Sequence, residues 1–261
     1  MKTLLICHSD SIISKKIISS WLQSFSELSG IVIISETKNR FAVRVKHEIK
    51  RVGILRFLDV LLFRVYYRLF LSKKDKLWEK NIVEGFERKN RNESNNIPII
   101  YTQSPNSLES KKFIKNINPD ILIARCKTIL KENIFSIPSK GSLVFHPGIC
   151  PQYRNAHGCF WALSNNDLKN VGMTLLKIDK GIDTGPIYGY YTYKFNEINE
   201  SHIIIQNRVV IDNLDKIKMK IIDIYNDKAS PLVIENKKTK LWGQPWLSKY
   251  IKWKFNAYMR K

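Results

Sequence analysis

Short apolar runs alternate with helical spacers over the first half of the chain. After the first run, apolar residues recur at Ile13, Ile17, Trp21 and Phe25, which is helical spacing. This alternation predicts an α/β fold, namely a Rossmann-like, mostly parallel sheet flanked by helices. No G-x-G-x-x-G follows the first run, so the sequence has no dinucleotide fingerprint. The runs expected to form strands are 3–7, 31–35, 97–103, 120–127 and 141–146.

One of these predicted strands ends in a histidine directly before a turn. In an extended strand side chains alternate, so Val144 and His146 are expected on one face of the sheet. Pro147 and Gly148 then end the strand. Ligands of parallel sheets bind beyond the carboxyl ends of strands, so His146 is placed to meet a substrate. A purely structural histidine is the alternative.

Two later segments have helical periodicity. Residues 51–71 carry a stripe of apolar residues with arginines interleaved, which we expect to pack on the core. The alternative is a helix that lies on a membrane surface. Residues 200–227 are expected to form a second helix that packs back on the core. The stripe in the first segment consists of Leu55, Leu58, Leu62, Tyr66 and Leu69.

The length of 261 residues suits one large domain with an appendage. We expect a catalytic domain at 1–228 and a basic, aromatic-rich C-terminal extension at 229–261. The aromatic residues of the extension are expected to dock on the core or on a second copy of the chain. Contact with phosphates and bases or with an anionic membrane is the alternative.

The net charge of +21 favours anionic partners that carry phosphate, but it does not choose among nucleic acid, nucleotide-sugar and lipid headgroups. The spacing of the four cysteines is not that of a secreted, disulfide-bonded domain, so we expect them to stay reduced. No apolar stretch reaches the length of a membrane span, and the N-terminus does not read as a signal peptide. We therefore expect a cytoplasmic protein, with peripheral membrane contact left open.

The loop after the strand holds four residues that could bind a metal. They are His146, Cys150, His157 and Cys159. Zinc sites of reliable spacing contain a C-x₂-C pair, which this loop lacks. We therefore predict no metal site and expect both cysteines to pack as small hydrophobic residues.

A carboxylate follows in a second loop. Asp183 lies between Gly181 and Gly185 after the predicted strand MTLLKID. A lone carboxylate in a glycine loop is usually a turn former. Paired with a histidine at another strand end, it can orient the imidazole and stabilise its protonated form.

The two segments together resemble a known family. HPGICPQYRN, with an IDTGPI loop whose Asp lies 37 positions after the His, resembles the 10-formyltetrahydrofolate-dependent formyltransferases, over roughly residues 98–191. The resemblance implies a Rossmann-like domain, 10-formyltetrahydrofolate as the carrier, and transfer of a formyl group to an amine. It also implies that His146 is the catalytic histidine and Asp183 its acidic partner.

The resemblance implies further site residues and one departure. Where the family has Asn, this chain has Val144, which cannot donate a hydrogen bond to an oxyanion. We expect Asn155 to supply that donor, with His157, Arg125 and Lys127 as other candidates. Tyr153, Arg154 and His157 are expected to contact the substrate. The carrier is expected to contact Arg125, Cys126, Lys127, Ile129, Gly181 and Ile182.

The acceptor amine is predicted to belong to a small anionic molecule, a nucleotide-linked amino sugar for surface polysaccharide. Small-tailed relatives in the family formylate such sugars, and the basic charge suits a dianion. Methionyl-tRNA formyltransferases carry a larger C-terminal domain, which makes tRNA the second choice. A hydrolase of the formyl carrier, or a non-catalytic folate- or nucleic-acid-binding relative, is the third, because of Val144. A homodimer is left open.

Overall fold

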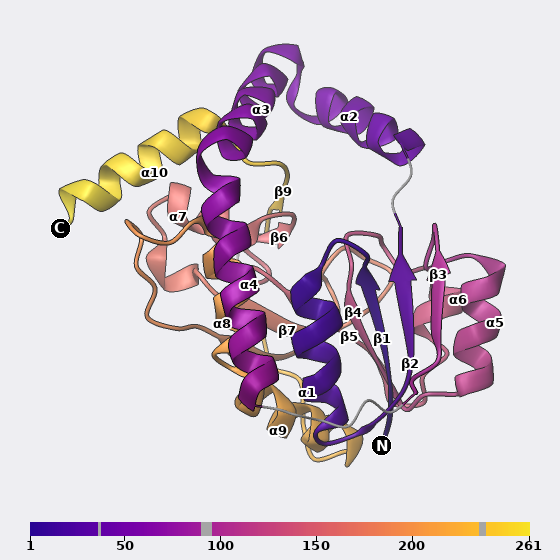
Figure 1. Cartoon of the computed structure of the whole chain (residues 1–261). Helices are drawn as coiled ribbons and strands as arrows, with labels where there is room; N and C mark the ends of the chain where they lie inside the picture. Colours follow the sequence, from indigo (N-terminus) through magenta and orange to yellow (C-terminus); the bar gives the residue numbers. More distant parts are fainter. Residues whose placement is uncertain (36–37, 90–95, 235–238) are drawn as a thin grey trace.

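A computed structural model describes residues 1–35, 38–89, 96–234 and 239–261, with side chains at 38–41 and 44 excepted. Its centre is a seven-stranded sheet of order β3-β2-β1-β4-β5-β7-β8 (Figure 1). The first five strands in this order are parallel, while β7 pairs antiparallel with both β5 and β8. The predicted α/β class and mostly parallel sheet are confirmed. The strands are β1 (Lys2–His8), β2 (Glu27–Ile34), β3 (Ile99–Thr102), β4 (Ile121–Arg125), β5 (Gly141–His146), β7 (Met173–Lys177) and β8 (Ile187–Tyr191).

Helices cover both faces of the sheet (Figure 1). Alternation along β1 sends Leu5 and Cys7 into the larger core, with α1, α4, α8 and α9, and sends Leu4 and Ile6 into a second core under α5 and α6. The helical segments are η1 (Ser14–Ile18), α1 (Ser19–Gln23), α2 (Lys38–Val52), α3 (Ile54–Tyr66), η2 (Tyr67–Leu71), α4 (Ser72–Lys89), α5 (Leu108–Ile117), α6 (Glu132–Phe135), α7 (Gly158–Ser164), η3 (Leu168–Asn170), α8 (His202–Ile211), α9 (Leu214–Tyr225) and α10 (Leu247–Met259).

The segment 51–71 departs from the prediction. Gly53, with φ of 80°, separates α2 from α3. The side of α3 that faces the core carries Phe57, Val60 and Phe63. The predicted core stripe is instead exposed at all four of its leucines. The helix is apolar on nearly every side, so its periodicity did not determine which side is buried.

The single helix expected over 200–227 is also wrong. The chain forms α8 and α9 with a break at Asp212 and Asn213. The side-chain amide of Asn213 donates to the carbonyls of Thr192 and Val209 at 3.1 and 2.8 Å. Asn competes with helical backbone bonding in this way, which ends α8 and redirects the chain.

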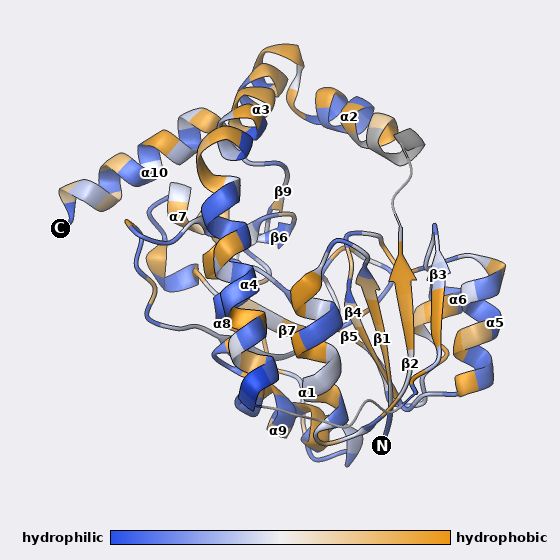
Figure 2. Cartoon of the chain, viewed as in Figure 1, coloured by the Kyte–Doolittle hydropathy of each residue, from blue (hydrophilic) through white to orange (hydrophobic). Residues whose placement is uncertain are grey.

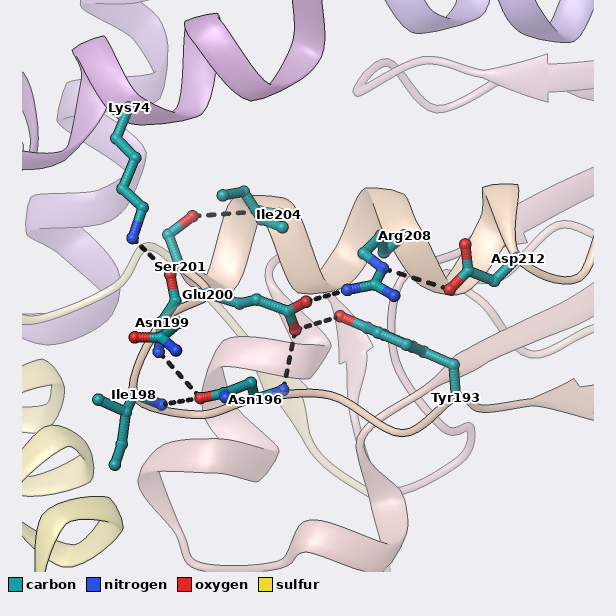
Figure 3. Close-up of polar contacts among 10 residues, drawn as sticks. All are labelled: Lys74, Tyr193, Asn196, Ile198, Asn199, Glu200, Ser201, Ile204, Arg208 and Asp212. Atoms are coloured by element: carbon teal, nitrogen blue, oxygen red, sulfur yellow. Dashed lines mark hydrogen bonds and ion pairs between the residues drawn. The ribbon is translucent and has the colours of Figure 1, made fainter. Parts of the chain in front are cut away.

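A polar network fastens the segment before α8 (Figure 3). The buried Glu200 carboxylate accepts from the Tyr193 hydroxyl at 2.8 Å and from the Asn196 N–H at 3.0 Å, and it also pairs with Arg208. The Lys74 ammonium of α4 donates to the carbonyl of Asn199 at 2.6 Å. This network therefore joins α4 to the body of the protein.

The C-terminal extension packs on the rest of the chain. A two-stranded parallel sheet joins β6 (Arg154–Asn155) to β9 (Leu241–Trp242), and α10 contacts α3 and α7. Trp253 is fully buried, whereas Phe255 and Tyr258 are exposed. The boundary at 228/229 stays a prediction.

Candidate active site

The candidate site is built around His146, the last residue of β5. The residue is 3% exposed, and its Nδ1 lies 3.3 Å from Oδ2 of Asp183. Nε2 lies 2.7 Å from the carbonyl oxygen of Tyr153. Each ring nitrogen therefore faces an oxygen acceptor, and the ring orientation is fixed from both sides. The structure brings together the two residues that the sequence analysis paired.

Asp183 is held by the loop that follows His146. The Asn155 backbone N–H donates to Oδ2 of Asp183 at 2.7 Å, the same oxygen that faces His146. Both residues have positive φ, 76° at Asn155 and 51° at Asp183, where Asn and Asp are tolerated better than most residues. One carboxylate oxygen thus ties β5, the loop 147–157 and the loop 178–186 into one arrangement.

Two glycines allow the turn after β5 to close on α7. A Cβ at Gly148 would lie 2.5 Å from the Tyr153 carbonyl oxygen and 3.0 Å from Nε2 of His146. A Cβ at Gly158 would lie 2.5 Å from Cα of Gly148. Because real Cβ atoms do not approach so closely, only glycine permits this packing.

Val144 faces the same side of the sheet as His146, since Leu143 and Phe145 belong to the large core on the other side. It is half-buried and packs against the small cluster of Cys150, Leu176 and Ile187. The position therefore offers an apolar surface, with no donor for an oxyanion.

Asn155, the expected replacement donor, is exposed, and its side-chain amide donates to the Trp242 carbonyl at 2.5 Å. One of its two amide hydrogens is therefore engaged within the protein. Among the other candidates, the Arg125 guanidinium is largely buried and lies 3.4 Å from the Ser14 hydroxyl. Burial lowers its pKa to about 10, so it stays charged at neutral pH.

Sequence comparison adds to this geometry. Residues 72–223 match the family model described as Formyl transferase. The chain belongs to the formyl transferase family.

The chain is similar in sequence to curated proteins over part of their length. Methionyl-tRNA formyltransferase of Thermotoga neapolitana is 32% identical over 133 residues, 48% of this chain and 42% of that protein. Bifunctional polymyxin resistance protein ArnA of Wigglesworthia glossinidia brevipalpis is 30% identical over 142 residues, 54% of this chain and 20% of that protein. The chain thus spans less than half the length of these curated relatives.

Solved structures share the fold at low sequence identity. A sugar N-formyltransferase from Shewanella sp superposes with a TM-score of 0.54 at 15% identity, over 93% of this chain and 77% of that one. A 4-N formyltransferase from Francisella tularensis has a TM-score of 0.55 at 12% identity, over 98% and 87%. Both support the Rossmann-like formyltransferase architecture.

Formyl transferases of this family use 10-formyltetrahydrofolate. The segment after β4 offers an apolar side chain to a ligand, because Ile129 is 60% exposed there. Ile178 and Cys126 both pack against the second core, and Lys180 pairs with Glu132 at 3.0 Å, so the segments 126–132 and 178–184 lie side by side. They hold five of the six positions at which carrier contact is expected, and the sixth, Arg125, is the last residue of β4. The Cys126 thiol donates to the Thr128 carbonyl, and the Lys127 backbone N–H donates to Nε2 of His8. Ile129 and Gly181 are exposed, and Ile182 is half-buried.

The three residues expected at the substrate lie on or beneath the loop. Tyr153 is buried, donates through its hydroxyl to Asp167 at 2.9 Å and stacks on Trp242. Arg154 is half-buried, and its Nε has no hydrogen-bond partner. Burial, then Lys127 and Arg64, lower the pKa of His157 to about 4, so its ring is neutral at pH 7. Their contact with a substrate stays a prediction.

Two supporting residues were missed in the sequence. The Thr174 hydroxyl donates to the Gly148 carbonyl at 2.6 Å and accepts from the Cys150 N–H at 3.0 Å, which holds the turn after His146. Trp242 stacks between Tyr153 and Trp161 and donates to the Gln152 carbonyl at 2.9 Å. Thr174 lies in the predicted strand MTLLKID and pairs with His146 in the sheet, so its place in a strand was the signal available in the sequence. No sequence pattern indicates that Trp242 contacts the loop.

Cys150 and Cys159 are buried, as expected of small hydrophobic packing residues. The Cys159 thiol lies 3.1 Å from the Gly172 carbonyl. Burial raises the pKa of both thiols to about 12, which keeps them as thiols at neutral pH.

Proposed function

We propose that the protein transfers a formyl group from 10-formyltetrahydrofolate to the amine of a nucleotide-linked amino sugar. The observation that carries the proposal is the contact between His146 and Asp183 at the carboxyl end of β5, in a chain of the formyl transferase family. Transfer to an amine needs a group that accepts a proton as the nitrogen attacks, and a buried histidine with a carboxylate partner suits that task.

The carrier, when bound, supplies the formyl carbon and takes up a proton on the nitrogen from which that carbon departs. His146 is proposed to hold the proton that the attacking amine loses. Asp183 and the Tyr153 carbonyl face its two ring nitrogens and would stabilise the charged ring. The Asn155 N–H keeps Asp183 in place.

The choice of an amino-sugar nucleotide, for surface polysaccharide, has two supports. The net charge of +21 favours a dianionic acceptor, and one of the structures with this fold is a sugar N-formyltransferase. Lys38, Arg40, Arg44 and Lys46 are candidates for its phosphates. Lys46 is exposed on α2, and the side chains of the other three lie outside the described residues.

Hydrolysis of the formyl carrier and carrier binding without turnover are the second candidates, and Val144 favours the latter. The apolar surface beside His146 provides no donor for the oxyanion that forms when either an amine or water attacks the formyl carbon. A tRNA acceptor is supported by similarity to methionyl-tRNA formyltransferases over part of their length.

One assay separates these functions. The protein is incubated with 10-formyltetrahydrofolate and, in parallel, with amino-sugar nucleotides, with charged initiator tRNA, or with no acceptor. Release of tetrahydrofolate is followed by absorbance, and the acceptor is examined by mass spectrometry. A formamido product on the sugar supports the proposal. Formylated tRNA, carrier hydrolysis without acceptor, or carrier binding without turnover each contradict it.

We place the reaction in the cytoplasm as part of the same proposal. All four cysteines are free, which suits a reducing compartment. In the described residues no helix combines the length and apolarity needed to cross a membrane.

A further inference from the structure

Large apolar side chains of α3 and η2 are exposed, and Figure 2 shows α3 mostly in the orange of hydrophobic residues. Eight such side chains are between 38% and 85% exposed. Single exposed leucines are ordinary, but a continuous apolar helix face marks an interaction surface. The residues are Ile54, Leu55, Leu58, Leu61, Leu62, Val65, Leu69 and Phe70.

The three charged side chains of α3 do not extend from this apolar face. Each of them contacts another part of the protein. The Arg56 guanidinium lies 5.5 Å from the ring centre of Trp246, and Asp59 accepts from the Ser248 N–H at 2.9 Å. Arg64 donates to the side-chain carbonyl of Gln244 at 3.5 Å. All three contacts fix α3 to residues 244–248, just before and at the start of α10. The helix therefore has a buried apolar side with Phe57, Val60 and Phe63 and a second, exposed apolar side, and its charged side chains contact residues 244–248.

A second apolar strip lies on α10, which packs beside α3 through Phe63, Tyr66 and Tyr250. The exposed apolar residues of α10 are spaced by four, three and one positions, so they share one side of that helix. They are Ile251, Phe255, Tyr258 and Met259. We call the exposed apolar residues of α3, η2 and α10 the helical face.

The charge of the segments that form the helical face is mostly positive. Residues 51–76 contain seven Lys or Arg and two acids, and residues 247–261 contain five Lys or Arg and no acid. Both acids are engaged: Asp59 with Ser248, and the buried Asp75 with the Tyr67 hydroxyl. A symmetric contact with a second copy would bring two basic rims together without carboxylates to pair them. An anionic surface with a hydrocarbon interior complements both the charge and the apolar side chains.

We propose that the helical face docks this protein on the surface of an anionic lipid bilayer. Leucine, phenylalanine and isoleucine side chains enter the boundary between headgroups and acyl chains, and Arg68, Lys73 and Lys76, which are exposed, contact lipid phosphates. The helices lie in the plane of the interface. In the described residues no helix could span the bilayer.

The surrounding contacts join the helical face to the segments around the candidate site. The Lys254 ammonium of α10 donates to the Glu200 carbonyl at 3.0 Å. In the same segment the Asn199 carbonyl accepts from Lys74, as Figure 3 shows. The strand β9, close before α10, pairs with β6, whose Asn155 holds Asp183. Docking therefore places the candidate site at a fixed position relative to the membrane. Both α3 and α10 lie outside the residues that match the family model.

Vesicle flotation with purified full-length protein tests the proposal. Vesicles of phosphatidylcholine alone are compared with vesicles that also contain phosphatidylglycerol. Wild type is expected to float with the anionic vesicles, about 10-fold more tightly than with the neutral ones, and to be released by salt. The double variant Leu58→Glu and Leu62→Glu is expected to bind at least about 10-fold more weakly, since it loses two apolar contacts and adds two negative charges.

A matched control makes the same change elsewhere. Leu108 and Met219 are similarly exposed on α5 and α9, so the double variant Leu108→Glu and Met219→Glu alters the net charge identically. It is expected to float like wild type. Equal flotation of the two double variants would overturn the proposal, as would failure of wild type to float. If wild type does not float and is dimeric by light scattering while the α3 variant is monomeric, the face is an interface between copies instead. Thermal unfolding verifies that each variant is folded.

Discussion

The Nδ1 atom of His146 lies 3.3 Å from Oδ2 of Asp183, although 37 positions separate the two residues in the chain. The contact exists because β5 ends at the turn that begins with Pro147, and because the loop between β7 and β8 brings Asp183 to that same edge of the sheet. The Asn155 N–H completes the arrangement from a third segment.

Loss of the Asp183 carboxylate is expected to lower the rate of formyl transfer more than the stability of the fold. Asp183→Asn keeps the shape and tolerates the positive φ, but it removes the negative charge that faces the imidazole. We expect kcat for formyl transfer to fall by about 10²-fold or more, with little change in carrier affinity. The control is Asp179→Asn, whose carboxylate bonds Thr184 and Gly181 in the same loop. Equal losses in the two variants would show that only loop structure is involved.

Val144 of β5 has no side-chain hydrogen-bond donor to offer an oxyanion in the site. Val144→Asn is expected to raise kcat by up to about 10²-fold, because an amide there reaches toward the oxyanion. The same change places a polar group against Leu176 and Cys150, so the free energy of unfolding should fall by about 1–3 kcal/mol. Val144→Ala serves as control and should not raise the rate. An unchanged rate in Val144→Asn would mean that another group already supplies the donor.

Trp242 is expected to stabilise the loop that carries Tyr153 and Asn155. Its ring stacks on Trp161 at 4.7 Å and on Tyr153 at 5.6 Å between ring centres. Trp242→Ala should lower the free energy of unfolding by about 3 kcal/mol, measured by denaturant titration. Trp242→Phe keeps an aromatic ring but loses the bond to Gln152, so it should lose about 1 kcal/mol. A stable Trp242→Ala protein would show that the extension does not support the site.

His157 makes stability depend on pH. Burial lowers its pKa to about 4, whereas the unfolded chain protonates histidine near 6.5. Between these values the unfolded state binds more protons, so stability falls as pH drops from about 6.5 toward 4, by on the order of 2–3 kcal/mol. His202, whose pKa is also lowered by burial and by His157, adds to the effect. His157→Asn suits the φ of 54° and should flatten the profile over that range. An unchanged profile would contradict the assignment.

Much of the sheet followed from the sequence, because buried parallel strands form short apolar runs with recognisable boundaries. Strand alternation correctly placed Val144 on the face of His146, away from the core of Leu143 and Phe145. The histidine and its carboxylate were found as a pair through the family resemblance, since neither motif alone indicates the contact.

Other features depend on tertiary contacts that local patterns do not report. The inner face of α3 is selected by Phe57, Val60 and Phe63, although leucines on the opposite side have equal periodicity. The two-residue strands β6 and β9 are too short to have a pattern. The amide of Asn155 donates to the Trp242 carbonyl, which is far away in the sequence, and its expected role at the oxyanion stays a prediction.

The rate of formyl transfer by His146→Asn tests the central claim most directly. Purified wild type and variant are compared for tetrahydrofolate release and for the formamido product, with the amino-sugar nucleotide that wild type uses best, after thermal unfolding has verified the fold. The predicted result is a loss of kcat of about 10²–10⁴-fold with carrier binding retained. A variant that forms the product at the wild-type rate would contradict the account.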